Sequence, residues 1–265
     1  MTHEEKVALW IGHGKIGVEI GAFKSPVPGL SPPPIYVDRF RDYAGERCLA
    51  DYYGDATALP FCDNSLDYVV TSHVLEHIPN PVQALAEWYR VLRPGGIIYC
   101  LVPDRRYTWD HGRLLTTVEH MLEDFERGTT VCDGTHIDDF VDGVDWATYS
   151  PGTAPGDVPA KKDELKKVYH GAVDSGGEIN IHFHVFEPVN LLALFEALRT
   201  WPRTRFAWEV VDRAERFPAN NPIGFLAVVR VEKTWRDRIA GWLNHHRTAR
   251  DQRAAILPTA KPFDP

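Results

Sequence analysis

The segment from Tyr53 to Pro103 limits the possible folds of this chain more than any other part of the sequence. A loop ending at Asp55 is followed by an apolar run, a long amphipathic stretch, a Pro-Gly-Gly turn and a second apolar run. This order predicts two strands joined by a helix. Polar residues stand where the strands end, including the cluster from Thr71 to His77. Because ligands bind at the carboxyl ends of strands in open α/β sheets, the segment predicts a small-molecule cleft.

Apolar spacing and the positions of proline and glycine predict the other elements. Pro81–Leu92 has a proline in its first turn and one apolar stripe, which predicts a helix. Ile97–Val102 is almost continuously apolar, as expected for a strand covered on both faces. Further strands are expected at Gly17–Ile20, Ile35–Asp38, Leu66–Thr71, Phe206–Val211 and Ile223–Val231, and further helices at Val7–Ile11, Leu114–Glu126, Lys161–His170 and Pro188–Arg199.

Four short motifs fall in one order along the chain: the turn Gly54–Ala56, the strand entry Asn64–Asp67, HVLEH at His73–His77 and RVLRPGG at Arg90–Gly96. In this order and spacing they resemble class I S-adenosylmethionine (SAM)-dependent methyltransferases. The resemblance covers roughly residues 15 to 230. It implies an α/β fold with a doubly wound, seven-stranded, mostly parallel Rossmann-like sheet, and SAM as the methyl donor.

A narrower resemblance concerns bacterial type 11-like methyltransferases that act in polysaccharide or secondary-metabolite pathways. It rests on VEIGAFKSP (Val18–Pro26), PDRRYTWDHGR (Pro103–Arg113) and TTVEHMLEDFERG (Thr116–Gly128). The resemblance therefore implies a small-molecule acceptor.

The family likeness also implies which residues contact SAM. Glu19 and Gly21 match the acidic residue and first glycine of the family's first motif, although Ala22 and the residues after it depart from the usual glycine pattern. Asp38 is expected to accept hydrogen bonds from the ribose hydroxyls, because one carboxylate can accept two. The remaining expected contacts are Asp55, Ala56 and Thr57 at the adenine, and Ser72 and His73 at the sulfonium side. An isolated aspartate in such a place is also an ordinary helix cap or turn residue.

Transfer to a hydroxyl group needs a base or a Lewis acid, whereas an amine needs only to lose its proton. The candidate catalytic residues are Asp110, His111, His182 and His184. His182 and His184 flank Phe183, so an extended segment would point both the same way. They also suit ordinary half-buried histidines.

The HVLEH motif offers a metal-assisted alternative. His73, Glu76 and His77 have the spacing that places residues on one face of a helical turn. The motif resembles the metal-binding ExxEH of small-RNA 2′-O-methyltransferases and a similar motif of ubiquinone-pathway O-methyltransferases, with His73 in place of the first glutamate. His182 or His184 would complete the site, and these ligands suit zinc, iron or manganese. Without a metal, His77 would cap or pack the turn.

The segment 103–187 interrupts the periodic pattern and is expected to form a lid or substrate platform. Arg105, Arg106 and Tyr107 at its root, together with His136, are the expected substrate contacts. From Asp104 to Asp145 the chain has eleven acidic residues and four arginines, an acidic block expected to overhang the cleft. Residues 1–247 are expected to form one methyltransferase domain and 248–265 a flexible tail.

Composition narrows the function classes further. A formal charge of −8 argues against a general nucleic-acid binder, which needs a basic surface. No apolar run is long enough for a bilayer and the N-terminus lacks a secretory pattern, so a cytoplasmic protein without membrane partners is expected. The four cysteines show no CxxC pair and are expected to be reduced.

The sequence therefore predicts O-methylation of a small hydroxylated molecule, a sugar or a secondary metabolite. N- or C-methylation and an inactive SAM-binding subunit remain alternatives. A nucleotide-binding oxidoreductase fits less well, because no Gly-x-Gly-x-x-Gly follows the first strand.

Overall fold

The computed structural model describes residues 1–234, so the predicted tail at 248–265 lies outside the described residues. Seven strands form one sheet in the order β5-β2-β1-β6-β7-β9-β8. The strands from β5 to β7 are parallel, whereas β9 runs antiparallel to both β7 and β8. Their bounds are β1 (Gly17–Ile20), β2 (Ile35–Asp38), β5 (Tyr52–Tyr53), β6 (Leu66–Ser72), β7 (Leu92–Pro103), β8 (Trp208–Phe217) and β9 (Gly224–Val231). The predicted seven-stranded, mostly parallel sheet is confirmed.

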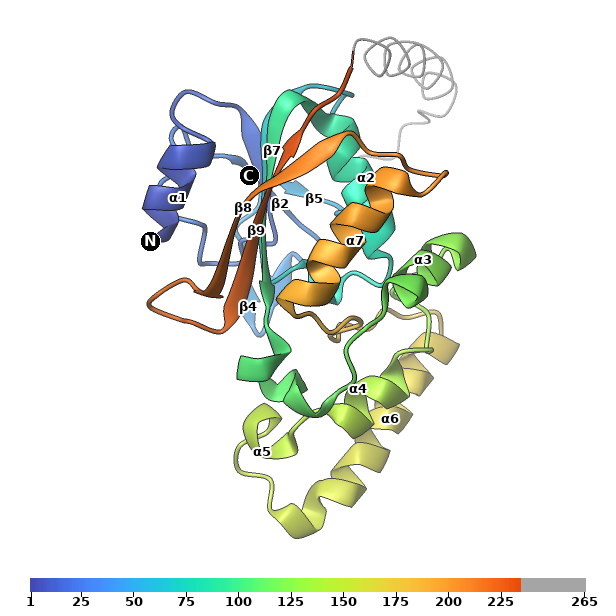
Figure 1. Ribbon diagram of the computed structural model, residues 1–265. Helices are drawn as coiled ribbons and strands as arrows, with labels where there is room; N and C mark the ends of the chain where they lie inside the picture. Colours follow the sequence, from blue (N-terminus) through green and yellow to red (C-terminus); the bar gives the residue numbers. More distant parts are fainter. Residues whose placement is uncertain (235–265) are drawn as a thin grey trace, which may run out of the picture.

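Helices cover both faces of the sheet (Figure 1). α1 (His3–Trp10) packs on one face, and α2 (Pro81–Val91) and α7 (Pro188–Thr200) pack on the other. Alternation along β6 explains the two layers, because Val69 belongs to the core under α2 while Tyr68 and Val70 belong to the core under α1. The two-sided burial accounts for the apolar runs in β6 and β7.

Several element boundaries differ from the sequence-based expectation. α3 (Val118–Arg127) begins four residues later than expected, because Thr117 Oγ1 accepts a hydrogen bond from His120 N at 3.2 Å and caps the helix. α6 (Val158–Asp174) is longer than the charged stretch that predicted it. β7 begins at Leu92, so the Pro-Gly-Gly turn lies inside this strand.

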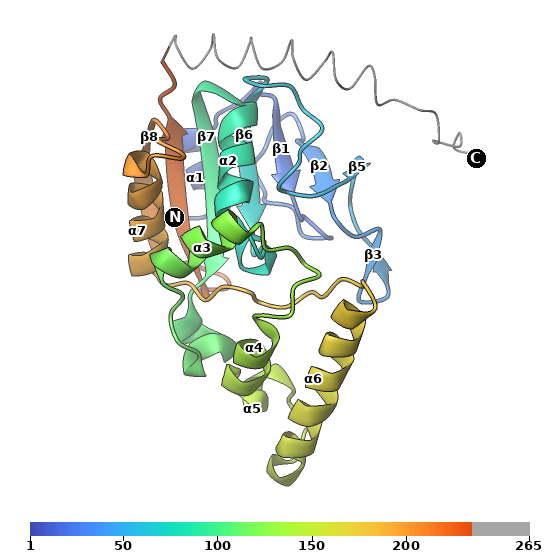
Figure 2. The same cartoon turned by 90° about the vertical axis from the view of Figure 1, so that its right-hand side faces the viewer.

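The segment after β7 forms a small helical lobe at the carboxyl ends of the parallel strands (Figure 2). Apolar residues of α4, α5 and the stretch before α7 make a core of its own, which includes Phe140, Trp146 and Phe183. The short elements of the lobe are η2 (Arg105–Tyr107), η3 (Trp109–Gly112), α4 (Ile137–Gly143), α5 (Trp146–Tyr149) and η4 (Pro155–Asp157). The lobe thus rests on the edge of the sheet where ligands are expected.

A two-stranded hairpin and a short helix complete the description. β3 (Asp42–Tyr43) and β4 (Glu46–Arg47) form a separate hairpin after β2, and η1 (Leu75–His77) follows β6.

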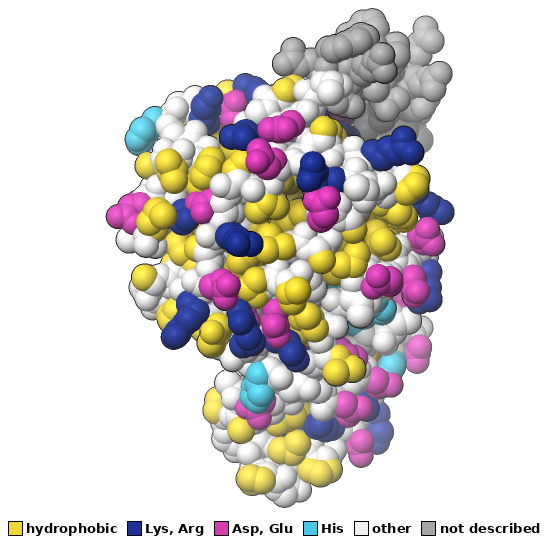
Figure 3. All heavy atoms as spheres, viewed as in Figure 1, with side chains coloured by type: hydrophobic (Ala, Val, Ile, Leu, Met, Phe, Trp, Pro, Cys, Tyr) yellow, Lys and Arg dark blue, Asp and Glu magenta, His cyan; other side chains and the backbone are white. Residues whose placement is uncertain are grey.

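On the face shown in Figure 3, acidic and basic side chains are interspersed with apolar ones and form no large patch of one sign. No helix within residues 1–234 has both the length and the apolar character to cross a bilayer.

Candidate active site

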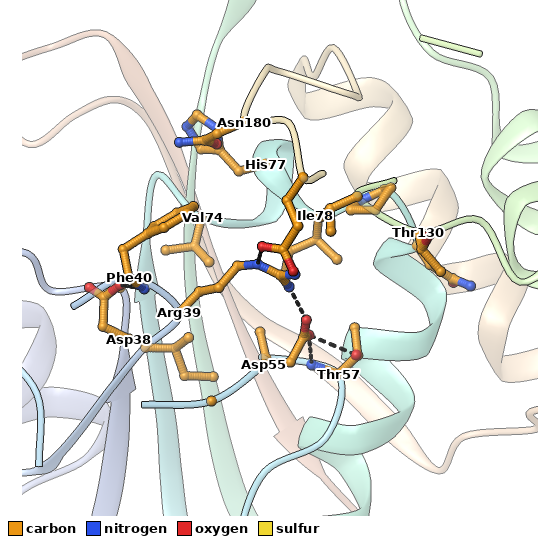
Figure 4. A pocket seen from close by; sticks show the side chains of 18 of the residues that line it. Asp38, Arg39, Phe40, Asp55, Thr57, Val74, His77, Ile78, Thr130 and Asn180 are labelled. Atoms are coloured by element: carbon orange, nitrogen blue, oxygen red, sulfur yellow. Dashed lines mark hydrogen bonds and ion pairs between the residues drawn. The ribbon is translucent and has the colours of Figure 1, made fainter. Parts of the chain in front are cut away.

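A cleft of ≈ 710 Å³ opens at the carboxyl ends of the parallel strands, between the sheet and the helical lobe. This volume is typical of small-molecule pockets, which span about 300–1,000 Å³. Figure 4 shows side chains from the ends of β2 and β6 and from the lobe around one pocket. Six residues predicted to contact SAM line it: Gly21, Asp38, Asp55, Ala56, Thr57 and His73.

Gly21 lets the chain turn sharply where β1 ends. Its φ of +69° is a conformation that side-chain-bearing residues rarely adopt. A Cβ at this position would also lie 2.6 Å from Val74 Cγ2. Glycine is therefore required here both by the backbone conformation and by the approach of the loop after β6.

Asp38 presents a buried carboxylate at the end of β2. Its Oδ1 accepts a hydrogen bond from Phe40 N at 2.9 Å, which helps to fix the side chain. Burial raises the pKa of Asp38 above its ordinary value, although backbone hydrogen bonds counteract this. A partly desolvated carboxylate is stabilised by hydrogen bonds from hydroxyl groups. A ribose diol offers two such donors, so the geometry suits it.

Asp55 is held by neighbours that the sequence did not suggest. Its Oδ1 accepts hydrogen bonds from Thr57 N at 2.8 Å and from Thr57 Oγ1 at 2.7 Å, while its other oxygen pairs with Arg39. Arg39 also reaches Glu178 of the lobe, with 2.7 Å between Nη2 and Oε1. Arg39 thus links the strand-end loops to the lobe across the cleft (Figure 4).

Three other residues predicted to contact SAM are not part of the cleft lining: Glu19, Ala22 and Ser72. Glu19 Oε1 instead accepts a hydrogen bond from Val27 N at 2.8 Å and so holds the loop after β1. Burial raises the pKa of this carboxyl to about 7. The role that the geometry gives Glu19 is to position the loop that carries Gly21.

The residues predicted to contact the substrate from the root of the lobe lie elsewhere. Arg105 holds Glu187 and the Arg113 carbonyl, and Arg106 pairs with Asp104 and with Glu215 of β8. Tyr107 is half-exposed beside Arg106, and none of the predicted three lines the cleft. The sequence-based placement fails because the turn η2 directs these side chains toward β8 and the base of the lobe.

The acidic block also does not overhang the cleft, contrary to expectation. No acidic residue from Asp104 to Asp145 lines it. Two of the buried members are instead paired inside the lobe, Asp104 with Arg106 and Asp110 with both Arg113 and His182.

The side chains of His182 and His184 point into different parts of the lobe, contrary to the expectation that both face the same way. The backbone there is not a strand, and the amides of Phe183 and His184 both point to the Glu76 carbonyl, at 2.7 and 3.4 Å. His182 joins one cluster with Glu76 and His77, and His184 joins a second cluster with His120, Asp124 and His136.

The first cluster consists of Glu76, His77 and His182, whose possible ligand atoms lie within 4.8 Å of one another. His77 lines the cleft, and His182 packs edge-on against it with 4.7 Å between ring centroids. His73 Nδ1 lies 3.7 Å from Glu76 Oε1, close to the cluster but outside the mutually close set. The structure thus brings together three of the four predicted metal ligands.

Each imidazole in this cluster is oriented by an oxygen atom on its outer side. His182 Nδ1 lies 2.6 Å from Asp110 Oδ2, and His77 Nδ1 lies 3.1 Å from the Ile181 carbonyl. Burial and the neighbouring His182 lower the pKa of His77, so it is neutral at pH 7. Burial opposes ionisation of Asp110, but the contact with His182 and the Arg113 charge bring its pKa below the ordinary value.

Glu76 is fully buried between these histidines. Neither of its carboxylate oxygens accepts a hydrogen bond from any described residue. Burial by itself would raise the pKa of Glu76, but His73, His77 and His182 together lower it. A buried, ionised carboxylate without hydrogen bonds calls for a cation or a proton nearby.

The other predicted catalytic and substrate residues lie outside the cleft. His111 is exposed, and its Nδ1 lies 3.2 Å from the Thr108 carbonyl. His136 and His184 are both buried in the second cluster. Residues that the sequence did not single out include Phe40, two positions after Asp38, and Glu178. Arg39 and Phe40 could have been predicted from their position directly after Asp38, the aspartate at the end of β2. No sequence pattern around Glu178 indicates that it would line the cleft.

Comparison with known proteins finds similarity to methyltransferases. Residues 14–100 match the family model described as a methyltransferase domain. The demethylmenaquinone methyltransferase of Staphylococcus epidermidis (strain RP62A) is 51% identical over 49 residues, 18% of this chain and 20% of that protein. That of Staphylococcus aureus (strain JH9) is 31% identical over 134 residues, 51% of this chain and 49% of that protein. The chain therefore spans about half or less of the length of these curated relatives.

Among solved structures, a SAM-dependent methyltransferase from Methanosarcina mazei is similar at 15% identity and a TM-score of 0.47, with coverage of 88% of this chain and 100% of that one. Residues 14–100 thus resemble a methyltransferase domain, and the sheet order, with its antiparallel β9, is that of the Rossmann-like methyltransferase fold.

Proposed function

We propose that this chain transfers the methyl group of SAM to a hydroxyl group of a small molecule. The observation that carries the proposal is the cluster of Glu76, His77 and His182, which reaches the cleft through His77 beside the end of β6. A neutral imidazole at this position can accept the proton that a hydroxyl must lose.

The cleft lining bears on the acceptor. Aromatic and aliphatic side chains such as Phe40, Ile78 and Phe125 line it together with the polar strand-end residues. Apolar walls favour an acceptor with an apolar body over a free sugar, so a secondary metabolite fits better than a polysaccharide unit. The curated relatives are named for demethylmenaquinone, a small molecule, which is consistent with this choice.

In the proposed reaction, the acceptor oxygen attacks the methyl carbon in line with the carbon–sulfur bond. The carbon–oxygen bond forms as the carbon–sulfur bond breaks, and S-adenosylhomocysteine leaves. The acceptor proton passes to His77 Nε2, because His77 Nδ1 is engaged by the Ile181 carbonyl. Asp110 holds His182 beside it and stabilises positive charge in the cluster.

The same cluster fits a divalent cation such as zinc, iron or manganese. Glu76 has carboxylate oxygens without hydrogen-bond partners among the described residues, and both imidazoles have the outer oxygen contacts common in metal sites. Glu76, His77 and His182 would hold the ion, which would supply Lewis acidity to lower the pKa of the acceptor hydroxyl.

A substrate screen with release of S-adenosylhomocysteine as the readout tests the proposal. Phenols and other hydroxylated metabolites should be methylated, and His77→Gln should abolish turnover without preventing SAM binding. His13→Gln, outside the cleft lining, is the matched control. Loss of activity with EDTA, together with loss of one bound metal in His77→Gln, would favour a metal on this cluster, and full activity with EDTA would favour His77 as a simple base. Methylation of amines alone would support N-methylation, and SAM binding without any turnover would support an inactive subunit.

A further inference from the structure

A second cluster of histidines and one carboxylate lies inside the wall of the cleft. Its members come from three segments of the chain: His120 and Asp124 from α3, His136 from the start of α4, and His184 from the stretch before α7. Asp124, His136 and His184 are buried, whereas the His120 side chain is 41% exposed. Their possible ligand atoms lie within 4.8 Å of one another.

Four of the six separations between these atoms are close to the edge length of a tetrahedral metal site. Asp124 Oδ2 lies 3.3 Å from His120 Nε2 and 3.4 Å from His136 Nε2. It lies 3.7 Å from His184 Nε2, and the His120 and His136 Nε2 atoms are 2.9 Å apart. Zinc binds nitrogen and oxygen at about 2.0–2.2 Å, which gives tetrahedron edges of roughly 3.3–3.6 Å. The observed separations bracket these lengths.

Hydrogen bonding leaves the centre of this cluster unsatisfied. Asp124 Oδ2 is buried and accepts no hydrogen bond from any described residue. The outer side of the cluster is in contrast well supported. Thr129 Oγ1 donates to Asp124 Oδ1 at 2.8 Å, and Thr135 Oγ1 lies 3.0 Å from His136 Nδ1. Outer contacts that orient the ligands around their inward-facing acceptor atoms are typical of metal sites.

The protonation states also suit a metal. Burial and the neighbouring His136 lower the pKa of His184 to about 3, so its imidazole is neutral. Burial opposes ionisation of Asp124, but the histidines and Thr129 lower its pKa, so it is a carboxylate. His184 Nε2 also lies 3.2 Å from the Pro79 carbonyl, a contact that metal binding would replace. Neutral imidazole and carboxylate are the forms that bind zinc.

We propose that His120, Asp124, His136 and His184 form a structural zinc site. Four protein ligands fill a tetrahedral shell and leave no open position, which distinguishes a structural from a catalytic site. The inference is independent of the proposed function, because it uses none of the residues of the Glu76 cluster.

The site has a structural consequence for the cleft. The loop after α3, 128–132, lines the cleft, and so do Ile179 and Asn180 close to His184. Zinc would join the segments that carry these loops to one another. Metal-free protein should therefore retain the sheet but have a less ordered cleft wall, with faster proteolysis between α3 and α4.

Metal content of the full chain tests the proposal. The protein is loaded with zinc, freed of excess and analysed by elemental mass spectrometry. The double variant His120→Gln/His136→Gln should lose one zinc per chain relative to wild type. The matched double variant His111→Gln/His170→Gln, with an exposed and a half-buried histidine of the same lobe, should keep it. The variant His77→Gln should also keep this zinc, which separates the site from the Glu76 cluster. A wild-type chain that binds no zinc, or a His120/His136 variant that loses none, would overturn the proposal.

A milder pair of variants guards against unfolding of the double variant. Thr129→Val removes the hydroxyl that supports Asp124, and the neighbouring Thr130→Val does not. Thr129→Val should weaken zinc binding about 10- to 100-fold, the usual effect of losing an outer contact, while Thr130→Val leaves it unchanged. Cobalt bound in place of zinc should show the strong visible absorption of tetrahedral coordination. Equal zinc affinity of the two variants, or an octahedral cobalt spectrum, would contradict the assignment.

Discussion

The substitution Asp38→Asn isolates the charge that we expect to hold the ribose of SAM. Asparagine has nearly the same shape, and its oxygen can keep the hydrogen bond that Asp38 accepts from Phe40 N at 2.9 Å. The change replaces the second carboxylate oxygen by an amide that can only donate. Burial already raises the pKa of Asp38, so loss of the charge should not destabilise the fold.

The size of the effect follows from the hydrogen bonds at stake. A hydrogen bond to a charged group contributes about 1.5–3 kcal/mol, and a ribose offers two hydroxyl donors. One weaker bond to the amide oxygen can survive, so the expected loss is about 2–4 kcal/mol. At 1.36 kcal/mol for each tenfold change, this corresponds to a loss of about 30- to 900-fold in affinity.

Isothermal titration with S-adenosylhomocysteine at pH 8 measures this loss. Asp42→Asn, an exposed aspartate of the nearby β3, is the matched control and should bind like wild type. Thermal unfolding of both variants shows whether the fold is intact. An intact Asp38→Asn protein with wild-type affinity would refute the placement of the ribose at the end of β2.

Four further results are expected. Gly21→Ala should lose SAM binding while Gly14→Ala does not, because only the former creates a contact of 2.6 Å with a neighbouring side chain; equal binding in titrations would contradict this. The pKa of Glu19 is about 7 in the folded protein against an ordinary 4.5. The free energy of unfolding of the wild type should therefore decrease as the pH rises from 4.5 to 7. Denaturation should show that the free energy of unfolding of Glu19→Gln, relative to that of the wild type, rises by up to about 3 kcal/mol between pH 4 and pH 8. If the difference between the two proteins does not change with pH, the burial argument is refuted. Arg39→Gln and Glu178→Gln should show a coupling of at most about 1 kcal/mol in a double-mutant cycle of stability, because the pair is partly exposed; a much larger value would mean a desolvated pair. If His77 is the base, the rate should fall only below the ordinary histidine pKa of 6.5, because the pKa of His77 is lowered; a fall centred above 6.5 would exclude it.

Local patterns were sufficient for the sheet and for most of the strand-end residues. Apolar runs bounded by polar residues mark where each parallel strand ends, and the ends of neighbouring parallel strands meet at one edge. For that reason Gly21, Asp38 and Asp55 could be placed together although they are well separated in sequence. Glu19 shows the limit of this reasoning, since its side chain supports the loop behind the cleft.

Side-chain direction in the irregular lobe could not be obtained in the same way. Alternation predicts direction only in a strand, and the stretch containing His182 and His184 bonds to the Glu76 carbonyl instead of to a neighbouring strand. The two histidines consequently enter different clusters. Arg105 and Arg106 were misplaced for a similar reason, because a short turn redirected them toward Glu187 and Asp104.

The sequence by itself determined the class of fold, the position of the cleft and the set of histidines available for chemistry. Only the tertiary structure decided how these histidines are grouped. His120 and His184 are brought together by the packing of α3 against the stretch before α7, and Glu178 meets Arg39 across the cleft. Such contacts depend on how distant segments pack, and no periodicity within one segment records the packing of another.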